Sequence, residues 1–63
     1  MRQALKEARE KKNMTQQQVA DTLGLSLRQY QRIECGDCDG TLTTWDRLED
    51  MFQIHQRKLR EIV

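Results

Sequence analysis

The pattern that most restricts the fold of this chain is a repeated helix start on either side of one glycine. Thr15 is followed three residues later by Gln18, and Ser26 is followed in the same way by Gln29. A Ser or Thr and a Gln at this spacing satisfy each other's free backbone N–H groups at a helix start. Gly24 lies just before the second start, where a positive φ costs glycine nothing. The pattern predicts two short helices joined by a turn of about three residues.

The residues between these helices also suit two helices that cross closely. Ala20 is small enough to lie at the crossing. The space between the helices would be filled by three apolar side chains, Leu25, Tyr30 and Ile33. This spacing over residues 15–36 is typical of a helix-turn-helix, a motif whose second helix, here about 26–35, lies in the major groove of DNA.

Helical spacing of apolar residues continues through the rest of the chain, and no segment alternates with period 2 for long. It predicts further helices at residues 2–12, 42–52 and about 56–62, the first of which would end at Asn13. The helix at 42–52 would bury one apolar stripe, Leu42, Trp45, Leu48 and Phe52. Together these elements predict an all-α fold, a compact five-helix bundle that forms a single domain over residues 1–63.

The length of the chain limits the class of protein. A chain of 63 residues builds one small core, which rarely supplies more than about 3–5 kcal/mol and leaves no room for a deep catalytic pocket. There is no carboxylate pair, nucleophile with a base, or glycine-rich phosphate loop, so we expect a binding module that is not an enzyme and needs no cofactor. No apolar run approaches the roughly 18 residues of a membrane span, so we expect a cytoplasmic protein with no membrane partner.

Charge is unevenly distributed along the chain. The formal net charge is only +1, which alone does not indicate a nucleic-acid partner. Up to Glu34, seven basic and four acidic residues give +3; from Cys35 onward, four basic and six acidic residues give −2. A polyanion is therefore expected to bind the first half.

These residues resemble a known family. The segment LKEAREKKNMTQQQVADTLGLS begins at Leu5, and Ile33-Glu34-x-Gly36 closes the second motif helix. In this combination they resemble the phage-repressor and Cro type of helix-turn-helix domain, the Xre family, with a similarity that extends to Leu59. The resemblance implies a compact five-helix bundle, sequence-specific binding of a dimer to a two-fold operator, and a role in transcriptional control.

The resemblance also implies roles for single residues. Gln16 would contact phosphate at the start of the first motif helix, and Arg9 and Glu34 match a buried salt bridge of the family. The groove would be faced by four residues, Ser26, Leu27, Arg28 and Arg32. The chain departs from the family in the following loop, which carries Asp37 and Asp39 where relatives commonly carry Lys or Arg, and which lacks the family's Pro. Because like charges near phosphates weaken binding, we expect modest affinity or a loop turned away from DNA.

Helical spacing supports the same groove-facing side from the residues alone. Arg28 and Arg32 are four residues apart, and Leu27 and Gln31 share their side. A guanidinium can donate two hydrogen bonds to guanine, and a leucine can contact a thymine methyl. The predicted base contacts are Ser26, Leu27, Arg28, Gln31 and Arg32. The alternative is that this side is only the solvated stripe of an amphipathic helix.

Three other residues are predicted to contact phosphate, Gln16, Gln17 and Lys12. Gln16 and Gln17 belong to the first turn of their helix, where free backbone N–H groups and the positive end of the helix dipole favour an anion. The alternative interpretation of the two glutamines is an ordinary helix surface.

Two cysteines, Cys35 and Cys38, have C-x-x-C spacing just after the predicted groove-facing residues. Structural zinc normally has four ligands and His55 is the one other soft ligand, so no metal is expected. We expect ordinary reduced cysteines, and the alternatives are a redox-responsive dithiol beside the DNA face or, less favoured, a metal ligand pair. His55 itself is expected at a helix start or on the surface.

Little apolar surface is left for a dimer. The candidates are Leu59, Ile62 and Val63, with Met51, unless these residues close the bundle instead. The expected partner is double-stranded operator DNA, bound by a regulator that represses by occupying the operator. Two alternatives stay open: a module of the same fold that binds another regulator through its acidic second half, and the DNA-binding part of an antitoxin-like or larger protein.

Overall fold

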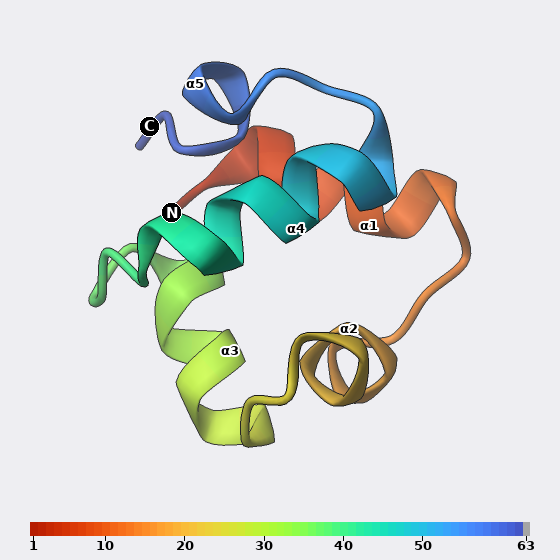
Figure 1. Ribbon diagram of the computed structural model, residues 1–63, viewed down its shortest axis with the longest axis vertical. Helices are drawn as coiled ribbons and strands as arrows, with labels where there is room; N and C mark the ends of the chain where they lie inside the picture. Colours follow the sequence, from red (N-terminus) through yellow and green to blue (C-terminus); the bar gives the residue numbers. More distant parts are fainter. Residues whose placement is uncertain (63) are drawn as a thin grey trace.

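The computed structural model describes residues 1–62, and its regular elements are α-helices (Figure 1). In chain order they are α1 (Gln3–Lys11), α2 (Gln16–Leu23), α3 (Leu27–Cys35), α4 (Leu42–Phe52) and α5 (Gln56–Leu59). No strand occurs within residues 1–62, so the all-α fold and the five-helix bundle are confirmed.

The helices place the α2–α3 pair at one side of the molecule. In Figure 1, α2 and α3 form the lower part, α1 and α4 cross the middle, and α5 lies at the top. α2 packs against α3, while α5 packs against α1 and α4. The side of α2 and α3 that faces away from α4 and α5 is therefore left open.

Both helices of the motif begin and end as their residues predict. Thr15 and Gln18 bond each other reciprocally, with Thr15 N donating to Gln18 Oε1 over 2.8 Å and Gln18 N to Thr15 Oγ1 over 3.1 Å. Ser26 and Gln29 form the same pair at the start of α3, over 3.0 and 3.1 Å. Gly24 then turns the chain with a φ of 74°. The two predicted capping pairs and the glycine turn are confirmed.

The end of α2 is closed by backbone bonds around that glycine. Leu25 N donates to Ala20 O over 2.9 Å and Gly24 N to Asp21 O over 3.2 Å. This pair of bonds satisfies carbonyls that have no partner within the helix. The turn between α2 and α3 is thus set by local chemistry, which fixes the angle between the two helices.

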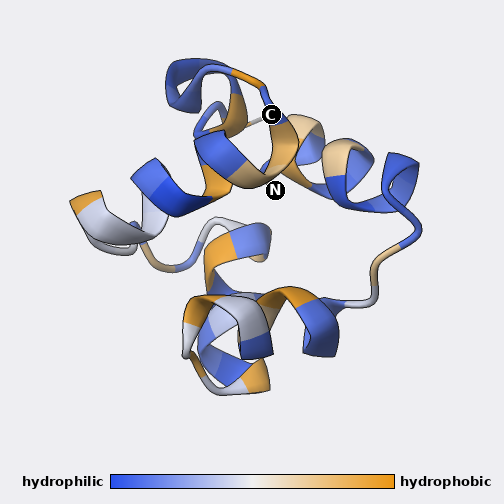
Figure 2. Cartoon of the chain, turned by 45° about the vertical axis from the view of Figure 1, so that its right-hand side comes forward, coloured by the Kyte–Doolittle hydropathy of each residue, from blue (hydrophilic) through white to orange (hydrophobic). Residues whose placement is uncertain are grey.

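The core is built from one side of each helix, and Figure 2 shows orange, hydrophobic residues alternating with blue, hydrophilic ones along the helices. The buried apolar residues are Leu5, Ala8, Val19, Ala20, Leu23, Tyr30, Ile33, Trp45, Leu48, Phe52 and Leu59. Trp45 is 1% exposed, as predicted. Leu25 is only partly buried against this cluster.

The prediction that Leu42 belongs to the core is wrong. Leu42 is 69% exposed, although it continues the stripe of Trp45 and Leu48. It is the first residue of α4, and helical side chains lean toward the N-terminus, so its side chain projects past the end of the helix. Thr44 is buried in this first turn instead, with its hydroxyl 3.0 Å from that of Thr41.

The last helix is shorter than predicted. It was expected to reach residue 62, but it ends at Leu59, which is fully buried. Ile62 is 60% exposed, so no packing holds a further turn, and short helices form only where packing supports them. Leu59 therefore closes the bundle, while Val63 lies outside the described residues. His55 caps the start of α5, where its Nδ1 accepts from Arg57 N over 3.1 Å.

Candidate nucleic-acid interface

The open side of α3 carries the residues predicted to contact bases. The exposed ones are Ser26, Arg28, Gln31 and Arg32, and Leu27 is half-buried. The opposite side of α3 is buried through Tyr30, Ile33 and Glu34. The structure therefore places Ser26 at the start of α3 and the other four predicted side chains on the side of α3 that faces away from the core.

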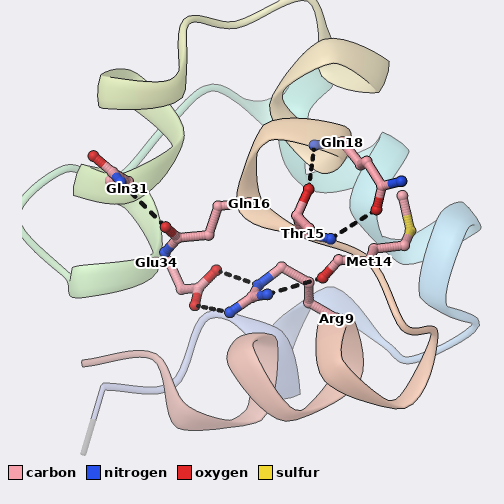
Figure 3. Close-up of polar contacts among 7 residues, drawn as sticks. All are labelled: Arg9, Met14, Thr15, Gln16, Gln18, Gln31 and Glu34. Carbon is pink, nitrogen blue, oxygen red and sulfur yellow. Dashed lines mark hydrogen bonds and ion pairs between the residues drawn. The ribbon is translucent and has the colours of Figure 1, made fainter.

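A side-chain hydrogen bond joins this side of α3 to the start of α2. Gln31 Nε2 donates to Gln16 Oε1 over 3.2 Å (Figure 3). Gln16 is the first residue of α2 and is half-buried, so the bond spans the junction between the two helices. A predicted base contact and a predicted phosphate contact are thus linked directly.

The other predicted phosphate contacts are separate from this bond. Gln17 is exposed, and its amide donates to Asp21 Oδ1 one turn along α2, over 2.8 Å. Lys12 is exposed at the end of α1, which leads into the start of α2. Both residues lie near the N-terminal end of α2, where backbone N–H groups favour an anion.

The capping pair at the start of α3 limits what Ser26 can do. Its hydroxyl oxygen already accepts from Gln29 N, and the Gln29 amide oxygen accepts from Ser26 N. The hydroxyl hydrogen of Ser26 is free to donate, so the side chain suits an acceptor atom such as a phosphate oxygen or a purine N7.

An ion pair holds the inner side of α3 against α1. Arg9 Nε and Nη2 donate to Glu34 Oε2 and Oε1 over 3.0 and 3.1 Å, and Arg9 Nη1 donates to Met14 O over 2.9 Å (Figure 3). Glu34 is 1% exposed and Arg9 12%. Hydrogen bonding to Glu34 raises the pKa of Arg9. The pair that the family resemblance implies is present, and through Met14 it also holds the segment before α2.

Tyr30 adds a buried hydroxyl beside this pair. Within residues 1–62 its oxygen has no hydrogen-bond partner. Burial raises the pKa of Tyr30, and the neighbouring Glu34 carboxylate raises it further. The side chain is therefore a neutral part of the core that packs against α1.

Both cysteines are on the surface, Cys35 as the last residue of α3 and Cys38 in the loop that follows. Cys35 and Cys38 are free and exposed. Within residues 1–62, no group of three or more His, Cys, Asp or Glu side chains is placed to hold a metal ion. Asp37 is exposed, whereas Asp39 pairs with Arg2 over 3.3 Å. The two acidic residues of the loop therefore have different surroundings.

The sequence pattern did not single out Arg2, which entered only the net charge of the first half. It is 2% exposed. Its guanidinium donates to Ile33 O and Cys38 O and lies 5.1 Å from the centre of the Trp45 ring. The available signal was spacing, since Arg2, Leu5 and Arg9 share one side of a helix.

A pair of capped helices joined by a glycine turn, with a polar, solvent-facing second helix, defines a helix-turn-helix protein. The family model described as helix-turn-helix matches residues 5–55, so this chain belongs to that family, of the Cro and Xre type. The family consists of DNA-binding transcription regulators, which are typically not enzymes. No curated protein and no solved structure matches the chain. None of the helices within residues 1–62 is long and apolar enough to cross a membrane.

Proposed function

We propose that this chain binds DNA sequence-specifically in the cytoplasm and represses transcription by occupying an operator, with residues 26–35 in the major groove. The observation that supports this most is the bond from Gln31 to Gln16, which couples the base-facing side of α3 to the phosphate-facing start of α2.

The start of α2 is suited to a phosphate. Because Gln16 Oε1 accepts from Gln31, its amide nitrogen keeps both hydrogens for an anion. The backbone N–H groups of the first turn and the positive end of the helix dipole favour the same ligand. Gln17 and Lys12 supply further donors beside it, and these contacts would set the register of the protein on the duplex.

The side chains of α3 provide the base contacts in this proposal. Gln31 gives one amide hydrogen to Gln16, which leaves its other hydrogen and its oxygen, the two groups that read N7 and N6 of adenine. Arg28 and Arg32 are exposed, and each guanidinium can bind O6 and N7 of guanine. Leu27 would meet a thymine methyl, and Ser26 would donate its hydroxyl hydrogen.

A homodimer on a two-fold operator belongs to the same proposal. With Leu59 buried and Met51 partly buried, Ile62 is the predicted interface residue that stays exposed within residues 1–62. The two recognition helices of such a dimer would lie about 34 Å apart, one turn of DNA. Sedimentation of the protein with and without DNA measures the oligomeric state, and a monomer on DNA would count against the dimer.

A second candidate function is supported by the loop after α3. The exposed Asp37 lies near the proposed DNA-binding side and the net charge is only +1, and both weaken attraction to phosphates. A module of the same fold that binds a basic surface on another regulator would keep these features. DNA selection separates the two functions.

The deciding experiment selects binding sites from a random DNA pool at two salt concentrations. We expect one motif to be enriched, and Arg28→Ala to relax a single position at a cost of about 1–3 kcal/mol. Arg57→Ala is the matched control, because it removes an exposed arginine from α5 on the opposite side of the molecule. No enrichment by the wild-type protein would reject sequence-specific binding and favour the interaction module.

A further inference from the structure

Two arginines of the first helical segment hold the last turn of α3 from different directions. Arg9 binds the side chain of Glu34. Arg2, two helical turns earlier, binds the backbone of the same turn: its N–H donates to Glu34 O over 2.9 Å, and its Nη1 donates to Ile33 O. The carbonyls at the end of a helix lack partners within the helix, and a cation there is favoured by the helix dipole.

The same buried guanidinium also reaches three other parts of the chain. It donates to Cys38 O over 2.8 Å and to Asp39 Oδ1 over 3.3 Å in the loop after α3. Its Nε donates to Arg60 O after α5 over 3.2 Å, and its plane lies over the ring of Trp45 in α4. One planar side chain with five donors thus ties α3 to the loop, to α4 and to the end of α5, and lysine cannot copy this geometry.

The predicted base contact Arg32 begins the last turn of α3, and Gln31 comes directly before it. The carbonyl of Arg32 accepts from three consecutive N–H groups, those of Gly36, Asp37 and Cys38. Arg2 holds the carbonyls on either side of this bonded turn, at Ile33 and Cys38. The conformation of the turn after Arg32 is therefore tied to the rest of the bundle through Arg2.

We propose that Arg2 is a positioning residue for DNA recognition. Being 2% exposed, it does not touch DNA; it holds the last turn of α3 at a fixed angle to the start of α2. Base contacts from α3 and phosphate contacts from α2 then fit one duplex at the same time. Arg2 also keeps Asp39, one of the two acidic loop residues, paired with a cation. This inference rests on the proposed function.

The test compares Arg2→Lys with Phe52→Leu, which changes a buried core residue at the C-terminal end of α4 and leaves every Arg2 partner named above in place. For each folded variant, we would measure the affinity for the selected DNA site and for sites with one base changed. We expect Arg2→Lys to reduce the preference at positions read by Gln31 and Arg32 at least tenfold. Phe52→Leu should lower the melting temperature and leave the preference unchanged. An unchanged preference in Arg2→Lys would overturn the proposal.

Amide hydrogen exchange gives a readout that needs no DNA. In Arg2→Lys we expect the amides of Gly36, Asp37 and Cys38 to exchange at least tenfold faster than in Phe52→Leu, and equal protection would also overturn the proposal.

Should Arg2→Lys fail to fold, Asp39→Asn removes one exposed partner of Arg2. This variant should change both the DNA preference and the amide exchange in the same direction as Arg2→Lys, by a smaller amount. No shift in Asp39→Asn would then count against the proposal. If the wild-type protein selects no DNA motif, the proposed function is wrong. The exchange measurement then still tests whether Arg2 holds the last turn of α3 in place.

Discussion

Glu34 links α3 to the first helical segment of the chain. The Glu34 carboxylate receives two hydrogen bonds from Arg9, and the Tyr30 hydroxyl lies near it. The backbone carbonyl of Glu34 receives a hydrogen bond from the backbone N–H of Arg2. Since both charged groups of the ion pair are largely buried, each depends on the other for the interactions lost with water. The ion pair therefore contributes to the hold of α3 on α1, beside the packing of Tyr30 and Ile33 in the core.

Replacing Glu34 is expected to unfold much of the protein. Glu34→Ala leaves the Arg9 guanidinium buried without its partner, which typically costs about 3–5 kcal/mol, comparable to the whole stability of a domain this small. Circular dichroism at increasing temperature measures the loss, and DNA binding should disappear with the fold. Glu7→Ala, an exposed change on α1, is the control. An unchanged melting temperature in Glu34→Ala would show that the pair contributes little.

The raised pKa of Tyr30 predicts that the protein loses stability at high pH. Its pKa is raised by burial, so the folded chain keeps a proton that the unfolded chain loses near the ordinary value of 10.0. The unfolded state then binds fewer protons, and the free energy of unfolding falls above pH 10 by up to about 1.4 kcal/mol per pH unit. Urea unfolding between about pH 8 and 12 measures this slope.

Tyr30→Phe is the matched control for this slope, since Tyr30 is the only tyrosine in the sequence. Its stability should fall less steeply above pH 10. Ultraviolet absorbance of the folded wild-type protein should also show no tyrosinate until the chain unfolds. A normal titration in the folded protein would contradict the burial of this hydroxyl.

At the level of helices, the motif was predictable because its boundaries depend on residues close in sequence. Thr15 with Gln18, Ser26 with Gln29, and Gly24 between them act through bonds within three residues. The exposed side of α3 followed from helical spacing alone. Local chemistry was therefore sufficient for the motif and for which residues share its open side.

Contacts between segments distant in sequence could not be predicted. Arg2 is buried only because the end of α3, the loop and the residue after α5 bring carbonyls to it. Leu42 is exposed because it is the first residue of α4 and its side chain projects past the end of the helix, although its spacing matches the buried stripe. Both outcomes depend on how the helices end relative to one another, which periodicity does not describe.

The end of α4 offers a test of backbone strain in one helix. Gln53 caps α4 with a φ of 57°, a conformation that costs a side-chain-bearing residue about 1–2 kcal/mol and glycine very little. Gln53→Gly should therefore raise stability by about 0.5–1 kcal/mol, after the loss of the bond from Gln53 Nε2 to Asp50 O and the greater freedom of glycine when unfolded. Thermal unfolding measures the gain, about 2–8 °C for a domain this small.

At the end of α2, Gly24→Ala does the opposite of Gln53→Gly, because it removes glycine from a position with a positive φ. No atom lies within 4 Å of an added Cβ there, so its φ of 74° is the source of any cost. We expect a loss of about 1 kcal/mol, opposite in sign to the gain at Gln53. Changes of the same sign at both positions would mean that backbone conformation does not decide these helix ends.

At the scale of the whole molecule, the distribution of charge decides how tightly a DNA-binding protein holds any duplex. The first half carries +3 and the second half −2, and the acidic loop comes directly after α3. Asp39 is paired with Arg2, so the exposed Asp37 is the loop carboxylate with more freedom to repel phosphates. The strength of binding to any sequence should therefore be adjustable at this one residue.

Asp37→Lys should raise affinity for all DNA sequences together. Replacing a negative charge near the phosphates by a positive one adds counterion release, so the slope of log affinity against log salt should steepen by about 0.9 for each phosphate gained. The preferred motif should stay the same, because Asp37 is outside the set of predicted base contacts. Asp46→Lys makes the same charge change on α4, where the exposed Asp46 accepts a hydrogen bond from Gln56 of α5, and should alter the slope much less. Equal effects from both variants would mean that net charge, and not the position of the loop, governs the attraction to DNA.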